Sequence, residues 1–325
     1  MLMVHVTAVF ARYMGGRGIM NLAHLHIVLN HVPSLGSIAG LLLLAIGMYR
    51  KDEGIKQFAD AVLVLITMAI LPTYISGAEA QRLVATNPSY SAGMIQLHQN
   101  AAMITLLSMT AAGMFAWFGL WEYRRRGQSG SLTTMATLIT TMAAVACVFV
   151  TGFIGGKISH PEIREAADKA VTEAVGWRQP IEMWVNGQAW SWPTLEMLHY
   201  VGMAFLFGVS TIYLFRMLGI MKGIGFRALH RLLPMAILGF VINTITGMIF
   251  FAASPQLYLA KQGFHIKMVG ILLATVPILY FTMFDEPWNV RADDDAPAAV
   301  KIAAVAIFVL VCAVMIYGRF LPFIS

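Results

Sequence analysis

The sequence predicts an all-α integral membrane protein with about eight transmembrane helices in two four-helix halves, plus a small outer insert. Of its 325 residues, 58% are hydrophobic and 12% are charged, and the mean hydropathy is +0.72. Apolar runs of the roughly 20 residues that a membrane-spanning helix needs recur along the chain. Lys and Arg gather in three short loops between these runs, as the positive-inside rule predicts for cytoplasmic loops.

Eight apolar runs account for most of the chain. The first opens with polar residues and contains Pro33, which neighbouring helices can accommodate and which often kinks a helix. The basic loops at 49–56, 122–132 and 216–231 belong in the cytoplasm. Both termini then face the periplasm of a bacterial inner membrane, and the acidic loop at 285–295 falls inside. The predicted spans are about 22–49, 57–78, 98–121, 133–156, 194–216, 230–253, 264–285 and 300–321.

The spans divide the chain into a first membrane half, 1–156, an outer insert, 157–193, and a second membrane half, 194–325. The first 18 residues lack a basic start and a clear cleavage site, so we expect a retained interfacial segment. In the insert, apolar residues at helical spacing after Pro161 predict an amphipathic helix. Asn186-Gly187 between aromatic runs then predicts a hairpin. Its tryptophans are typical of an interfacial aromatic belt or of a surface that docks a partner.

Several functions are excluded by what the sequence lacks. It has no GxSxG, Walker loop or HExxH, so no hydrolase or nucleotide site is indicated. Without CxxCH it carries no covalent haem of its own. Cys147 and Cys312 lie in apolar runs and are expected to be small buried hydrophobes. The net charge of +6 resides mainly in topology-setting loops, so nucleic acid is not an expected partner.

Six of the nine histidines are expected at the outer end of the bundle. In each half, the first and third helices begin with histidine on the same side. Facing helices of a bundle supply cofactor ligands, and two imidazoles can clasp a flat haem. The preferred ligand pairs are His31 with His98 and His199 with His265, while His26 and His160 are alternative or supporting ligands. The six are His26, His31, His98, His160, His199 and His265.

Neighbouring residues fit the same interpretation. Arg82, Arg164, Lys157 and Lys267 can pair with haem propionates. Small residues would let a macrocycle approach the backbone, namely Gly36 and Gly40 or Gly202 and Gly208. The alternative is that each histidine is a polar residue at the membrane interface and binds no cofactor. We expect this role for His5, His24 and, at the cytoplasmic end, His230.

The strings LHIVLNHVPSLG, LPTYISGAEA, IQLHQNAAM and TGFIGGKISHPEIR resemble a family of uncharacterised four-helix bacterial membrane proteins. The matching positions include His26, His31, His98 and His160. The stretch from LHYVGMAFLFG to GFHIKM resembles a second such family through His199, Thr246-Gly247 and Lys267, whereas His265 departs from that family's pattern. The chain thus resembles a fusion of the two. The resemblance implies membrane residence and an association with redox chemistry, and the architecture is similar to that of b-type cytochromes.

The leading expectation is a b-type haem electron-transfer subunit of a larger redox complex, with one or two haems b. It would be a non-catalytic subunit of an oxidoreductase, exchanging electrons with quinol or a periplasmic c-type cytochrome. One alternative is a copper or zinc site formed by His26, His31, His98 and His160. Another is a cofactor-free membrane scaffold whose tryptophan-rich insert docks a periplasmic partner.

Overall fold

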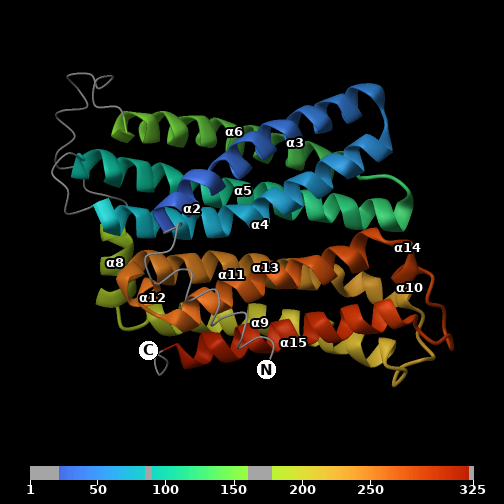
Figure 1. Cartoon of the computed structure of the whole chain (residues 1–325). Coiled ribbons are helices and arrows are strands. Elements are labelled where there is room, and N and C mark those ends of the chain that lie inside the picture. Colours follow the sequence, from blue (N-terminus) through green and yellow to red (C-terminus); the bar gives the residue numbers. More distant parts are fainter. Residues whose placement is uncertain (1–21, 85–89, 160–177, 322–325) are drawn as a thin grey trace. The chain divides into compact units, whose positions relative to one another are not determined.

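The computed structural model describes residues 22–84, 90–159 and 178–321. Within these ranges every regular element is a helix (Figure 1). Eight helical segments are long and apolar enough to cross a membrane. The protein is therefore a multi-pass membrane protein in contact with the lipid bilayer, and the predicted fold class is confirmed. The predicted N-terminal interfacial segment and the predicted helix after Pro161, with His160 and Arg164, fall on residues outside the described ranges.

The chain forms two compact units whose boundaries differ from the sequence halves. Unit 1 comprises the residues up to Gly113 together with Met135–Pro180, and unit 2 comprises Met114–Thr134 with Ile181–Ser325. Unit 2 thus includes the connected ends of α5 (Ala92–Arg126) and α6 (Ser131–Ser159). Within unit 2, the Trp117 indole donates to Thr282 Oγ1 at 3.3 Å, and the Trp121 indole donates to the His230 carbonyl at 3.0 Å. These contacts join residues too distant in sequence for periodicity to reveal.

In unit 1 the first membrane span is two helices. α2 (Leu22–Leu29) and α3 (His31–Arg50) meet at Asn30 and both pack on α4 (Glu53–Val84). Pro33 lacks an N–H, so it leaves the Leu29 carbonyl without its usual helical partner. The Thr73 hydroxyl of α4 lies 3.4 Å from that carbonyl. The interruption therefore follows from Pro33, and it sets α2 against the C-terminal part of α4.

Unit 2 contains four further spans: α9 (Ser191–Met217), α11 (Leu233–Ala253), α13 (Gln262–Met283) and α15 (Ala298–Phe320). α9 packs against α11 and α15, and α13 packs against α15. α9 and α11 approach closely at two glycines, because a Cβ on Gly202 would lie only 2.8 Å from the Gly239 carbonyl oxygen. Only small residues allow membrane helices to approach this closely.

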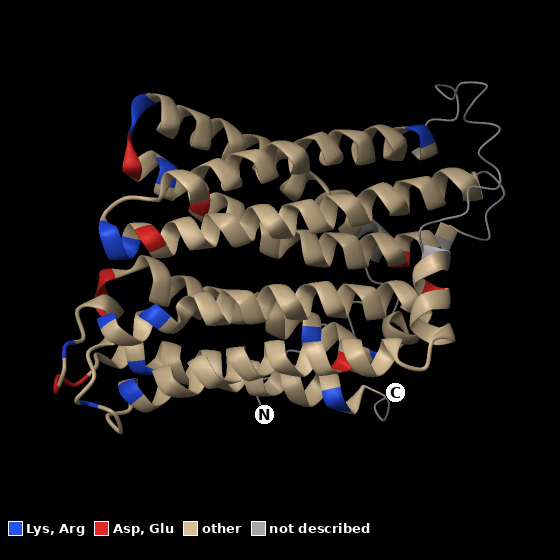
Figure 2. Ribbon diagram, turned by 180° about the vertical axis from the view of Figure 1, so that it is seen from behind, with Lys and Arg blue, Asp and Glu red and all other residues tan. Residues whose placement is uncertain are grey.

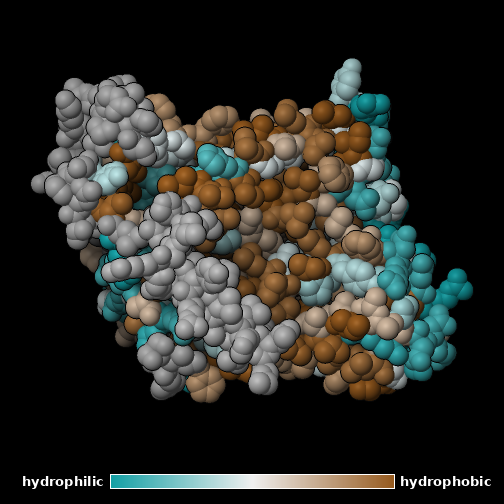
Figure 3. Space-filling model, viewed as in Figure 1, coloured by the Kyte–Doolittle hydropathy of each residue, from teal (hydrophilic) through white to brown (hydrophobic). Residues whose placement is uncertain are grey.

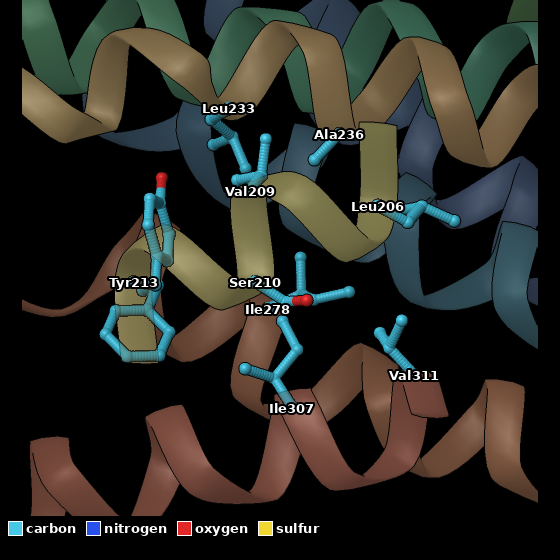
Figure 4. Close-up of a pocket in the computed structure, with 10 residues that line it drawn as sticks. Leu206, Val209, Ser210, Tyr213, Leu233, Ala236, Ile278, Ile307 and Val311 are labelled. Atoms are coloured by element: carbon cyan, nitrogen blue, oxygen red, sulfur yellow. The ribbon is translucent and has the colours of Figure 1, made fainter. Parts of the chain in front are cut away.

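A small cavity lies among these four helices (Figure 4). Its walls are mainly aliphatic and aromatic, and its polar groups include the hydroxyls of Ser210 and Tyr213. The Tyr213 hydroxyl is buried and has no hydrogen-bond partner among the described residues. A cavity of about 20 Å³ has room for one water molecule.

Charged side chains gather at the helix ends, and the middle of most long helices is uncharged (Figure 2). At one end of unit 2, the fully buried Arg216 ties two loops together. Its guanidinium donates to the carbonyls of Ile224 and, at 2.5 and 3.3 Å, of Arg291 and Asp294. Asp295 pairs with Lys222 at 2.8 Å, and the hydrogen bond and charge of this lysine lower the pKa of the Asp295 carboxyl.

The predicted hairpin at Asn186-Gly187 is wrong, because residues Arg178–Gly187 form helix α8. Val185 is 1% exposed and packs with Leu195 and Ala253, while Trp184 contacts Trp190 edge to face at 5.7 Å. A helix satisfies its own backbone hydrogen bonds, whereas two short isolated strands at the membrane boundary cannot. Asn-Gly therefore ends a helix here, a role in which both residues are also common.

The outer surface of the helices is apolar where lipid would contact it. Hydrophobic side chains form a broad area over the middle of the face shown in Figure 3. Large exposed residues on the spans include Leu35, Phe149, Phe153, Val276 and Ile302, all at least 63% exposed. Exposed apolar area of this extent needs a lipid or protein partner.

Candidate functional site

His26 lies against the C-terminal part of α4. Its Nδ1 is 3.0 Å from the Thr73 carbonyl oxygen and 3.3 Å from the Ser76 hydroxyl. Its ring covers Gly77, where an added Cβ would lie 2.8 Å from Cε1 of the imidazole. Because glycine has no Cβ, the imidazole can pack directly against the backbone of α4 at this position.

His98, on α5, makes the same arrangement with α6. Its Nδ1 is 3.0 Å from the Thr151 carbonyl oxygen, and a Cβ at Gly155 would lie 3.1 Å from its Cε1. In both cases the receiving helix supplies threonine and, four residues later, glycine: Thr73 with Gly77 and Thr151 with Gly155. Residues four apart share a helix face, so the threonine carbonyl and the glycine surface form one seat for an imidazole.

His199, on α9, has a related seat on α11. Its Nδ1 is 2.7 Å from Thr246 Oγ1, and its Cε1 lies 3.7 Å from the Cβ position of Gly247. The amide of Asn243, turned to satisfy both neighbours, donates to the His199 carbonyl at 2.7 Å and accepts from the Met203 N–H at 3.1 Å. These are the two backbone groups that an α-helix ordinarily joins to each other, so Asn243 holds α9 at the histidine.

The hydrogen bonds determine the tautomer of all three imidazoles. A carbonyl oxygen can only accept, so Nδ1 of His26 and of His98 must carry the proton. The Thr246 hydroxyl donates to the Ile242 carbonyl at 2.7 Å, so it accepts from Nδ1 of His199. Each Nε2 therefore keeps its lone pair. A metal-ligating histidine commonly has this arrangement, with one nitrogen held by a backbone or side-chain oxygen and the other available.

The structure brings some of the predicted ligands together. In unit 1, the rings of His26 and His98 are close enough to interact electrostatically. In unit 2, the Lys267 ammonium interacts electrostatically with the His199 ring. His31 is exposed. His265 packs edge to face on Phe264 at 6.2 Å.

The predicted propionate partners have distinct surroundings. The Arg82 side chain is 58% exposed and pairs with Glu79 at 3.0 Å. Lys157 is buried and lies over the Phe153 ring at 4.7 Å. Nζ of Lys267 lies 3.2 Å from the Cβ position of Gly318 on α15.

Of the four glycines predicted to let a macrocycle approach the backbone, three are covered by side chains or backbone of a neighbouring helix and serve helix packing. Ile66 occupies the space over Gly36 and Leu63 the space over Gly40, while α11 covers Gly202. Gly208 alone of the four has nothing within 4 Å of its Cβ position. The sequence did hold a signal for the glycines that seat the imidazoles, since TYISG and TGFIG share the Thr-x-x-x-Gly spacing.

Sequence reasoning missed the burial of one histidine. His230 is fully buried, lies 4.9 Å from the Trp288 ring in an edge-to-face contact, and has no hydrogen-bond partner for either ring nitrogen in the described part of the chain. The adjacent Arg231 indicated instead that His230 is an interfacial residue at the cytoplasmic end. Among the described residues, no group of three or more His, Cys, Asp and Glu side chains is arranged to hold a metal ion.

No family model, curated protein or solved structure matches the chain. The three imidazoles, each with an oriented ring, are the strongest indication of a functional site. His26 and His98 lie in unit 1. His199 lies in unit 2, where Lys267 is its charged neighbour.

Proposed function

We propose that the chain is a b-type haem electron-transfer subunit of a larger redox complex in a bacterial inner membrane. Its partners would be other subunits of that complex and, as electron donor or acceptor, quinol or a periplasmic c-type cytochrome. The basic loops would face the cytoplasm and both termini the periplasm. The axial ligands would be Nε2 of His26 and Nε2 of His98.

The observation that carries this proposal is the matched pair of imidazoles in unit 1. Both rings have Nδ1 held by a threonine carbonyl at 3.0 Å, and both keep an available lone pair on Nε2. Such a hydrogen bond orients the ring and raises the basicity of the ligating nitrogen. Two polar rings in membrane-spanning helices are costly without a role, so their presence favours a functional site.

The remaining residues fit a haem rather than a bare metal ion. A bis-histidine haem needs only two protein ligands, which agrees with the lack of a larger ligand cluster among the described residues. Arg82 lies beyond Gly77 on α4 and Lys157 lies beyond Gly155 on α6, so each receiving helix carries, toward the same end as its seat, a cation that could pair with a propionate. Bound haem would supply one-electron chemistry, while the protein sets its potential through these ligands and their burial.

The test is a pyridine haemochrome assay on the full chain purified in detergent, with dithionite difference spectra. We expect haem b with a reduced α-band, and loss of haem in His26→Ala and in His98→Ala. His31→Ala is the matched control, because His31 is exposed and its removal should leave the haem content unchanged. Loss of haem from His31→Ala with retention in His26→Ala would overturn the ligand assignment.

A preparation without haem would overturn the proposal itself. Elemental analysis then separates the alternatives. Stoichiometric copper or zinc would support a metal site, and its absence would support a membrane scaffold. For the scaffold, Trp184→Ala or Trp190→Ala should weaken partner assembly while the histidine variants leave it intact.

A further inference from the structure

His199 and Lys267 form a polar pair that the proposed haem ligands leave unused. Both lie in membrane-spanning helices, His199 on α9 and Lys267 on α13. The helix between them is α15, which packs on both. Gly318 of α15 lies against Nζ of Lys267, and its neighbour Arg319 acts electrostatically on Tyr200, next to His199. These residues therefore lie at one level of unit 2.

The chemistry of the pair is specific. Nε2 of His199 is a hydrogen-bond acceptor, because Nδ1 carries the proton. Lys267 is a donor only, and it has no ion-pair partner among the described residues. A metal cation would be repelled by the ammonium group, and a carboxylate would be repelled by the lone pair of Nε2. A hydroxyl group suits both, since it donates to His199 and accepts from Lys267.

The surroundings favour an aromatic ring on that hydroxyl. Phe250 lies 6.2 Å from the His199 ring, edge to face, and 4.6 Å from the Trp192 ring. Trp192 and His199 are both partly accessible. Aromatic faces and a pair of polar groups on a membrane helix match a lipid-soluble phenol, which needs burial for its ring and hydrogen bonds for its oxygen.

We propose that His199 and Lys267 bind the hydroxyl group of a membrane hydroquinone, the His199 Nε2 accepting its proton in a hydrogen bond and the Lys267 ammonium donating to its oxygen. This inference rests on the proposed electron-transfer function, for which a hydroquinone is a suitable electron donor. Thr246 and Asn243 are positioning residues, because they hold the His199 ring and its backbone rather than the ligand.

The test uses the full chain in detergent under anaerobic conditions, with menadiol and its dimethyl ether as ligands in titration calorimetry. The ether keeps the ring but has no O–H to donate. We expect menadiol to bind at least about tenfold more tightly than the ether, a difference equivalent to about 1.4 kcal/mol. His199→Phe should abolish this preference, and Lys267→Met should weaken the binding of both ligands by about tenfold.

Lys261→Met is the matched control, because it removes a partly exposed lysine at the start of the same helix. It should bind menadiol as the unaltered chain does. Equal affinities for menadiol and its ether, or equal effects of Lys261→Met and Lys267→Met, would overturn the inference. So would loss of haem from His199→Phe with menadiol binding unchanged, since His199 would then be a haem ligand.

The haem content of the same preparations separates this inference from the proposed function. Menadiol discrimination in a chain without haem would overturn only the electron-transfer proposal. Haem retained by a chain that does not discriminate would overturn only the hydroquinone site. His26→Ala should lose haem and still prefer menadiol over the ether.

Discussion

Replacing Gly77 by alanine perturbs the seat of His26 and leaves the histidine itself in place. The added Cβ would lie 2.8 Å from Cε1 and 3.1 Å from Nδ1 of the imidazole. Carbon atoms do not approach this closely without displacement, so the ring must move. The Thr73 carbonyl holds Nδ1 at 3.0 Å, and the displaced ring loses that bond.

The expected change in the free energy of unfolding follows from three terms. Alanine is favoured over glycine in a helix by about 1 kcal/mol. The lost hydrogen bond costs about 0.5–1.5 kcal/mol, and overpacking costs about 1–3 kcal/mol. The variant should therefore be less stable by about 0.5–3.5 kcal/mol, and its haem content should fall because Nε2 is no longer oriented.

Two further glycines provide a graded series. At Gly155 the added Cβ would lie 3.1 Å from Cε1 of His98, so alanine there should have a smaller effect. At Gly152, in the same helix, nothing lies within 4 Å, so alanine should stabilise by up to about 1 kcal/mol. The assay is denaturant unfolding in detergent micelles followed by circular dichroism, with haem content measured on each variant. If Gly77→Ala is as stable as Gly152→Ala and keeps its haem, the seat described here is not what orients His26.

Three other predictions concern unit 2. Arg216→Lys should lower the free energy of unfolding by about 1.5–3 kcal/mol for each charged hydrogen bond lost; a denaturation curve that overlays the parent would contradict the loop-tying role. His230→Leu should raise stability by about 1 kcal/mol, since it removes a buried group without a hydrogen bond among the described residues; a less stable variant would reveal a partner. Asp295 has a lowered pKa. Its ion pair with Lys222 should therefore stabilise the fold at pH values above the usual carboxyl pKa of 3.8, and this stabilisation should be lost as the pH falls through the lowered pKa. Urea unfolding of Asp295→Asn and of the parent should therefore differ at neutral pH and converge as the pH falls below 3.8 and through the lowered pKa of Asp295; a constant difference would refute the assignment.

The number, order and approximate bounds of the described spans follow from the apolar runs of the sequence. Each span is one continuous apolar run, and hydrocarbon requires the backbone to satisfy its hydrogen bonds within the segment, so composition alone predicts a helix. The same rule explains why the hairpin prediction at Asn186-Gly187 is wrong. The two residues are a local turn signal, but at the membrane boundary a helix satisfies the backbone better than two short strands.

Packing between helices selects the histidines that can act as ligands. The sequence favours His31 as the ligand, with His26 as an alternative, yet His26 has a carbonyl and a glycine from α4 beside it, while His31 is exposed. The assignment of Nε2 as the available nitrogen depends on Thr73, Thr151 and Thr246, each of which lies on a different helix from its histidine. Helical periodicity shows which residues share a face, but the neighbour across the helix interface determines the hydrogen bonds, and only packing in three dimensions selects that neighbour.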